Sequence, residues 1–203
     1  SSSFFKFYST EVEPRLIKTR NILELGEYRQ VISEMTAAIS KTRGHLAYIE
    51  DSTVESKIAN RLPESYTLRA QGQYGLGLSR GLYGRFKKSV ADCNDALFID
   101  SNYAAAYAVR GMAHYQMDLK EKAFEDFNYA VQLSSDNPFF LFQRGWHYQN
   151  EDRLKWALDD FNQAIDLDPF FIDAYIARSN LYESLNKIDL AEGDLEKIKS
   201  LRK

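Results

Sequence analysis

The stretch PFFLFQRGWHYQNEDRLKWALDDFNQAIDLDPFF, residues 138–171, decides the fold of this chain of 203 residues. It predicts two short helices folded against each other. Pro138 and Pro169 mark the ends of the unit, because proline cannot continue a helix and biases the residue before it away from helical geometry. A related pattern stands once on each side of this stretch. The fold is therefore expected to be built by repetition.

A spacing of 34 residues relates the stretch to its neighbours. Small residues recur at 111, 145 and 179, each directly after an arginine, and alanine recurs at 123, 157 and 191. Three further columns keep the same step: Phe127, Phe161 and Leu195; Leu133, Leu167 and Leu201; and Asp92, Asp126, Asp160 and Asp194. A fixed period near this length is typical of stacked repeats.

The spacing has a mechanical meaning. The small residue and the alanine twelve positions later are expected where two antiparallel helices approach closely. A large side chain there would overpack the contact, at a cost of about 1–3 kcal/mol. We also expect each aspartate to pair with the arginine 18 positions later, in the next repeat, as Asp126 with Arg144. The alternative is that these charges form a stripe that binds an anion or a peptide.

These residues resemble the tetratricopeptide repeat (TPR) family. The resemblance covers residues 103–203 well and residues 63–102 less well. It implies an all-α fold: a right-handed α-α superhelix, or TPR solenoid, of about four helical-hairpin repeats with an N-terminal helical extension. The residues that carry it are Tyr107, Arg110-Gly111, Ala123, Phe127 and Ala130; Gly145, Tyr148, Ala157, Phe161, Ala164 and Asp168-Pro169; and Tyr175, Tyr182 and Ala191.

We divide the chain accordingly into five segments. Residues 1–62 form an N-terminal arm and a degenerate helical pair, with a break at Gly26 and a helix stop at 42–44. Residues 63–102 form a divergent TPR-like repeat with a long glycine-rich first helix. The regular TPR repeats follow at 103–136, 137–170 and 171–203. A polar connector with a short helix around 54–62 is expected between the first two segments.

The glycines at 72, 75, 77, 81 and 84 have two interpretations. Close helix packing with a turn at 81–84 is the first, and it includes an insertion of seven residues that lengthens both helices. A phosphate-binding loop is the second. It is disfavoured because no strand pattern precedes the glycines and the Lys88-Ser89 pair lies too far along.

Composition excludes several classes of function. The net charge is −3, and neither part of the chain is basic, so a nucleic-acid surface is not expected. The single cysteine, Cys93, is expected to be a core residue. No apolar run reaches the ~20 residues that span a membrane. His114 and His147 have no further metal ligands near them, and no catalytic set is evident. We therefore predict a non-enzymatic protein without cofactor or metal.

The two ends of the sequence leave alternatives open. Lys6-Phe7-Tyr8-Ser9 looks like the end of a mitochondrial presequence, and it could instead belong to an arm that packs its phenylalanines. We expect an intracellular, cytoplasmic protein, with a mitochondrial location as the alternative. The last repeat ends at residues 200–203 without a polar capping helix, which stacked repeats usually need. Either the chain continues there or another molecule covers that end.

The resemblance also implies a binding surface. In the family, the inner faces of the first helices line a concave groove that holds a peptide. Capture of the acidic tail of Hsp70 or Hsp90 is disfavoured, because Met112 and Asp173 stand where that clamp needs an asparagine and a lysine. Phe142 and Trp146 either line an open groove or pack against the chain itself. The predicted partner-binding residues are Val109, Met112, Phe139, Phe142, Gln143, Trp146, Asn150, Asp173, Ile176 and Asn180.

The predicted function follows from this surface. We expect a protein-protein interaction module or adaptor that binds a hydrophobic or aromatic peptide of another protein in its concave groove. The alternative is a structural subunit of a larger assembly, docked through its uncapped C-terminal repeat and its N-terminal arm.

Overall fold

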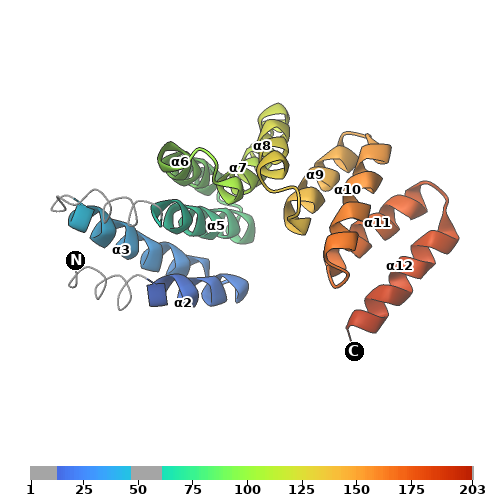
Figure 1. The fold of residues 1–203 in the computed structure, drawn as a ribbon, viewed down its shortest axis with the longest axis horizontal. Helices are drawn as coiled ribbons and strands as arrows, with labels where there is room; N and C mark the ends of the chain where they lie inside the picture. Colours follow the sequence, from blue (N-terminus) through green and yellow to red (C-terminus); the bar gives the residue numbers. More distant parts are fainter. Residues whose placement is uncertain (1–12, 47–60, 203) are drawn as a thin grey trace. The chain divides into compact units, whose positions relative to one another are not determined.

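The computed structural model describes residues 13–46 and 61–202, and this part of the chain contains ten α-helices and no strand (Figure 1). The predicted fold class, an all-α fold of helical hairpins, is confirmed. The N-terminal arm and most of the predicted connector lie outside the described residues. The helices are α2 (Glu13–Glu24), α3 (Tyr28–Leu46), α5 (Leu62–Arg80), α6 (Tyr83–Ile99), α7 (Ala104–Gln116), α8 (Lys120–Leu133), α9 (Pro138–Asn150), α10 (Leu154–Leu167), α11 (Ile172–Ser184) and α12 (Ile188–Leu201).

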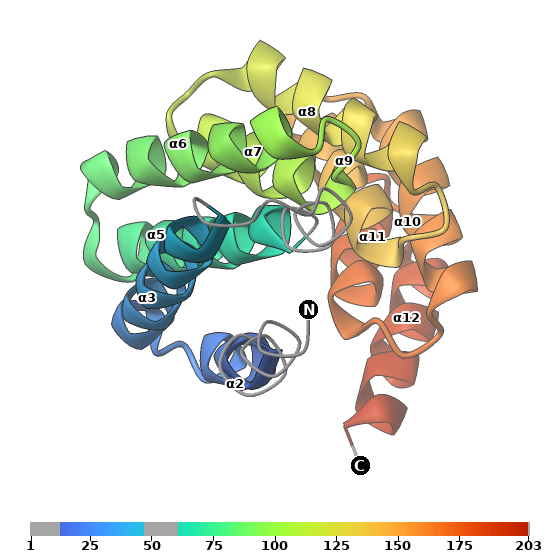
Figure 2. The ribbon, with the colours of Figure 1, turned by 60° about the vertical axis from the view of Figure 1, so that its left-hand side comes forward.

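The chain divides into two compact units, residues 1–123 and 124–203, and the division falls within α8. In the first unit, α5 packs against α3 on one side and α6 on the other, and α2 lies against α3 (Figure 2). The core of this unit includes Tyr66, Cys93 and Val109. Cys93 is fully buried, as predicted for a core residue.

The glycines of α5 allow the neighbouring helices to approach closely. A Cβ atom on Gly75 would lie 2.2 Å from the Tyr28 ring of α3, and one on Gly77 would lie 2.7 Å from the Phe86 ring of α6. Gly81 ends α5 in the left-handed region, with φ +62°, where glycine has no steric penalty. The first interpretation, close packing plus a turn, is confirmed.

One predicted helix end is wrong. The helix α3 continues through the predicted stop at 42–44 and ends at Leu46. Gly44 lies exposed within this helix, and a Cβ atom there would meet no atom within 4 Å. Glycine weakens a helix by about 0.5–1 kcal/mol relative to alanine, and so does not by itself end one.

The second unit contains two antiparallel hairpins, α9 with α10 and α11 with α12. A Cβ atom on Gly145 would lie 2.9 Å from the Phe161 ring and 3.0 Å from Cβ of Asp160. In the next hairpin, the Ser179 hydroxyl donates to the carbonyl of Ala191, at 3.2 Å. The predicted close approach at the small-residue column is confirmed in both hairpins.

The turns of the hairpins share a feature that the sequence analysis missed. Asp118, Asp152 and Asn186 have φ values of 59°, 57° and 55°, and they are spaced by 34 residues. Asp and Asn adopt this left-handed conformation more readily than other non-glycine residues. They allow each tight turn between consecutive helices without a glycine.

The predicted pairing of aspartates with arginines 18 positions later is wrong. Arg144 instead binds Asp160 of its own hairpin through two hydrogen bonds, Nε to Oδ2 at 2.8 Å and Nη2 to Oδ1 at 2.7 Å. Arg178 binds Asp194 in the same way, at 2.9 and 2.6 Å. The hydrogen bond to Asp160 raises the pKa of Arg144. The ion pairs therefore join the two helices of one hairpin.

An asparagine makes the link to the preceding hairpin. Arg178 Nη1 donates to Asn162 Oδ1 at 2.7 Å, and Asn162 stands two residues after the aspartate column. Arg69 and Asp92 lie 23 residues apart, seven more than the 16 between Arg144 and Asp160, which confirms the predicted insertion. The corresponding links to the preceding repeat are Arg144 to Asn128 (3.4 Å), Arg110 to Asn94 (2.7 Å) and Arg69 to Thr36 (3.4 Å). Between α2 and α3, Lys18 donates to Glu34 at 3.1 Å.

Candidate functional site

The second unit carries a hollow of about 600 Å³ between α9 and α11. Both helices stand on α10, which supplies the apolar base beneath them. Six of the ten predicted partner-binding residues line the hollow. The lining residues are Phe142, Trp146, Gln149, Asn150, Asp173, Ile176, Ala177 and Asn180.

The local sequence explains why these side chains share one surface. Asn137 caps α9, and its Oδ1 accepts from the backbone N–H groups of residues 139 and 140, at 3.0 and 3.3 Å. Pro138 follows at the first helical position, where a missing N–H costs nothing. With the start of α9 fixed, Phe142, Trp146 and Asn150 fall at intervals of four and lie along one face.

The aromatic side of the hollow is anchored in the core. The Phe142 ring lies 5.1 Å from the Phe171 ring and 6.0 Å from the Phe161 ring, centroid to centroid. Trp146 packs against the cluster that contains Phe161 and Leu181. Phe142 and Trp146 are both half-buried, and both also line the hollow. Each ring thus packs on one side against the chain and borders open space on the other.

The polar side of the hollow comes from carboxamides and one carboxylate. Asn150 Nδ2 donates to the carbonyl of Trp146 at 2.7 Å, which leaves its side-chain oxygen as an acceptor. Within the part of the chain that the structure describes, the side chains of Gln149, Asp173 and Asn180 make no hydrogen bond or ion pair. Their donors and acceptors are therefore open to a ligand.

The other predicted residues lie elsewhere. Val109 is 2% exposed in the core of the first unit, so its side chain cannot contact a partner there. Met112 is half-buried on α7 of the same unit. Phe139 is 38% exposed at the start of α9, and Gln143 is half-buried, but neither lines the hollow.

Two lining residues, Gln149 and Ala177, are not among the ten predicted ones. Gln149 lies seven positions after Phe142, which is two helical turns on the same face of α9. That spacing is the signal that could have found it.

Among residues 13–46 and 61–202, no group of three or more His, Cys, Asp or Glu side chains is placed to hold a metal ion. None of the helices in these two ranges combines the length and apolar character needed to cross a membrane. His147 is buried, and its ring stacks on Phe124 at 5.4 Å with an interplanar angle of 20°.

Comparison with solved structures identifies the fold of the chain. No family model and no curated protein matches the sequence. A crystal structure of MamA superposes with a TM-score of 0.61 at 18% sequence identity, over 87% of this chain and 94% of that one. The chain has the fold of MamA. The MamA RS-1 ArsTM double mutant gives 0.59 at 15% identity, over 93% and 94% of the two chains. MamA 41-end from Desulfovibrio magneticus RS-1 gives 0.58 at 15% identity, over 93% and 95%.

Proposed function

We propose that this chain is a non-catalytic protein-interaction module whose hollow between α9 and α11 binds a peptide segment of another protein. The observation that carries the proposal is the position of Trp146, half-buried against the core and bordering about 600 Å³ of open space. Tryptophan is the residue type most often found where a few side chains dominate the energy of an interface. Phe142 extends the same apolar surface.

The rigidity of this surface favours binding. The rings of Phe142 and Trp146 are already held by Phe161 and its neighbours, so little side-chain entropy is lost when a partner covers them. Ile176 and Ala177 supply the facing wall. An aromatic or aliphatic side chain of the partner would fill the space between the two walls.

The polar groups define the rest of the partner. A carboxamide carries both donors and acceptors, which matches the N–H and C=O groups of a peptide backbone, and Gln149 and Asn180 present theirs unpaired. The unpaired carboxylate of Asp173 favours a lysine or arginine in the partner and opposes an acidic tail. The expected ligand is therefore an apolar anchor residue followed or preceded by a basic one.

The chain offers a direct optical test of this proposal. It contains two tryptophans, Trp146 and Trp156. Trp156 does not line the hollow and is 55% exposed, so Trp156→Phe leaves Trp146 as the only indole. We expect peptides with an apolar anchor beside a basic residue, selected from a displayed library, to shift the emission of this variant. Trp146→Ala should weaken their binding by ~30-fold, the effect of losing a 2 kcal/mol anchor.

Two controls separate binding from folding. Circular dichroism melts must show that Trp146→Ala remains folded, because its indole also contacts the core. Asp173→Lys changes an exposed side chain and should reverse the charge preference of the bound peptides. Because Asp173 lies in the first turn of α11, this variant should melt at a slightly lower temperature but remain folded. If the selected peptides bound both variants with the same affinity as the original chain, the proposed peptide-binding groove would be refuted.

The second candidate is a structural subunit docked through α12. Leu195 stands 34 residues after Phe161, and it is 40% exposed where Phe161 is fully buried. This exposed leucine favours a covering partner. Glu192 and Lys199 argue the other way, because they replace Leu158 and Ile165 at the corresponding positions and solvate the same helix. We therefore rank docking through α12 below peptide binding.

A further inference from the structure

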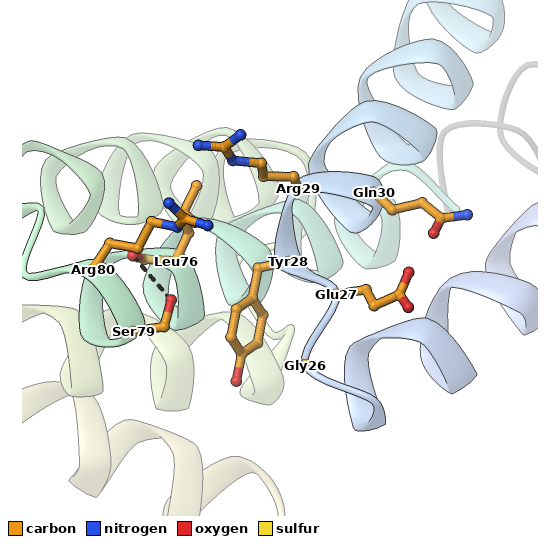
Figure 3. Close-up of a pocket in the computed structure, with 8 residues that line it drawn as sticks. All are labelled: Gly26, Glu27, Tyr28, Arg29, Gln30, Leu76, Ser79 and Arg80. Atoms are coloured by element: carbon orange, nitrogen blue, oxygen red, sulfur yellow. Dashed lines mark hydrogen bonds between the residues drawn. The ribbon is translucent and has the colours of Figure 1, made fainter.

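The first unit carries a second hollow, of about 580 Å³, where the turn between α2 and α3 meets the C-terminal end of α5 (Figure 3). Its lining is unlike that of the hollow between α9 and α11. Two arginines, Arg29 at the start of α3 and Arg80 at the end of α5, come from helices that pack against each other. No role was predicted from the sequence for the residues of this hollow.

The two arginines are not used by the fold. Both are exposed, and neither makes a hydrogen bond or an ion pair in the part of the chain that is described. In Figure 3 their guanidinium groups lie on the same side of Tyr28, while the carboxylate of Glu27 lies on the other side. Glu27, the acidic residue among those that line the hollow, is thus turned away from them.

The position of Arg29 breaks a local rule of helix stability. The first turn of α3 contains no acidic residue and carries this arginine instead. A positive charge at a helix N-terminus is unfavourable, because the N-terminus already bears a partial positive charge from the aligned peptide dipoles. Local choices that weaken a fold without a compensating contact concentrate at functional sites.

The surroundings fix the two helix ends that carry the arginines. Tyr28 fits against Gly75, where a Cβ atom would lie 2.2 Å from its ring, so the start of α3 is seated on α5. Leu76 is buried and forms the floor between the arginines. The site therefore combines two packed helix ends with two unpaired guanidinium groups.

We propose that this hollow is an anion-binding site that takes a phosphate monoester. Such a group carries a charge of about −1.5 to −2 near neutral pH and three strong acceptor oxygens. Each guanidinium group offers parallel N–H donors that match the oxygens of a phosphate. The two positive charges of the arginines balance the charge of the phosphate dianion. A single carboxylate as the ligand would balance only one of them. The phosphate can belong to a phosphorylated side chain of a partner protein or be free in solution.

The experiment titrates the full chain with three probes. These are inorganic phosphate, a short peptide containing phosphoserine, and the same peptide with unmodified serine. Backbone and arginine side-chain NMR signals report the contact. We expect both phosphate probes to shift the signals of residues 26–30 and 79–80, and the unmodified peptide to leave them in place. Tighter binding of the phosphopeptide assigns the site to a modified partner, whereas equal binding assigns it to free phosphate.

Substitutions decide whether the arginines carry the binding. Arg29→Gln and Arg80→Gln should each weaken phosphate binding by about tenfold, since each removes a charged bidentate donor. The double variant should lose it. Glu27→Gln should strengthen it by a few fold. Binding should also fall with added salt, because exposed charges are screened.

The control is Arg202→Gln, which removes an exposed arginine outside the hollow and should change nothing. Arg29→Gln should melt at the same temperature or higher, because it relieves the charge at the start of α3. An unchanged affinity in the double variant, or an equal loss in Arg202→Gln, would overturn the proposal. Neither result bears on the groove between α9 and α11, because none of these residues lines it.

Discussion

Gly145 shows how one atom can set the geometry of a hairpin. A Cβ atom there would lie 2.9 Å from Phe161 and 3.0 Å from Asp160, and both of those residues are buried. Gly145→Ala should therefore destabilise the chain by about 1–2 kcal/mol: overpacking costs ~1–3 kcal/mol, and the better helix propensity of alanine returns up to ~1 kcal/mol. Chemical denaturation monitored by circular dichroism measures the difference.

Gly193 provides the matched control. It lies in α12 of the same unit, and a Cβ atom there would meet no atom within 4 Å. Gly193→Ala should therefore stabilise the chain, by about 0.5–1 kcal/mol. If both substitutions changed the free energy of unfolding in the same direction, helix propensity and not close packing would explain the small residue at 145.

Residue types alone predicted some positions and missed others. The small residue at 145 could be predicted, because only a repeated close contact explains why a column stays small. The left-handed turn residues could also have been predicted from the sequence, since Asp118, Asp152 and Asn186 share the 34-residue period. Val109 could not be placed correctly. Neighbouring residues of a helix point in different directions, so a shift of one residue exchanges a groove position for a core position. Only packing fixes how the helix is rotated.

At the scale of helices, the charged columns define how hairpins are held. Arg144 and Arg178 each make two hydrogen bonds to an aspartate of their own hairpin and one to an asparagine of the preceding repeat. The sequence could not distinguish an aspartate 16 positions later from one 18 positions earlier, because both belong to the same periodic column. The period identifies the column, and only the three-dimensional packing decides which neighbour the side chain reaches.

Two substitutions separate the two contacts of Arg178. Arg178→Met leaves Asp194 buried without its partner, and breaking such a pair costs about 3–5 kcal/mol. Asn162→Ala removes only the 2.7 Å hydrogen bond to the preceding hairpin, and we expect a loss of about 1–2 kcal/mol. Urea denaturation of both variants tests this order. A larger effect of Asn162→Ala would mean that the link between hairpins dominates.

At the scale of the whole molecule, the sequence predicted a continuous series of hairpins, with a degenerate pair and a divergent repeat before three regular ones, and the structure divides that series within α8. A period treats every repeat alike, so it contains no information on where compact units begin and end. The same limit applies to the two hollows. The one between α9 and α11 follows from repeat positions, whereas the arginine site arises from α3 and α5, where the period is broken by the longer helices.

The surface of α12 bears on the second functional candidate, and it predicts the state of the chain in solution. Leu195 and Ile188 are exposed, but Glu192 and Lys199 lie on the same helix at positions that are apolar in α10. Charged side chains among the apolar ones oppose a stable interface, because the core of an interface is depleted of charged residues. We expect static light scattering to give the mass of one chain over a wide range of concentration, and Leu195→Glu to leave that mass unchanged. A larger species that Leu195→Glu dissociates, while Trp146→Ala does not, would instead establish α12 as a docking surface.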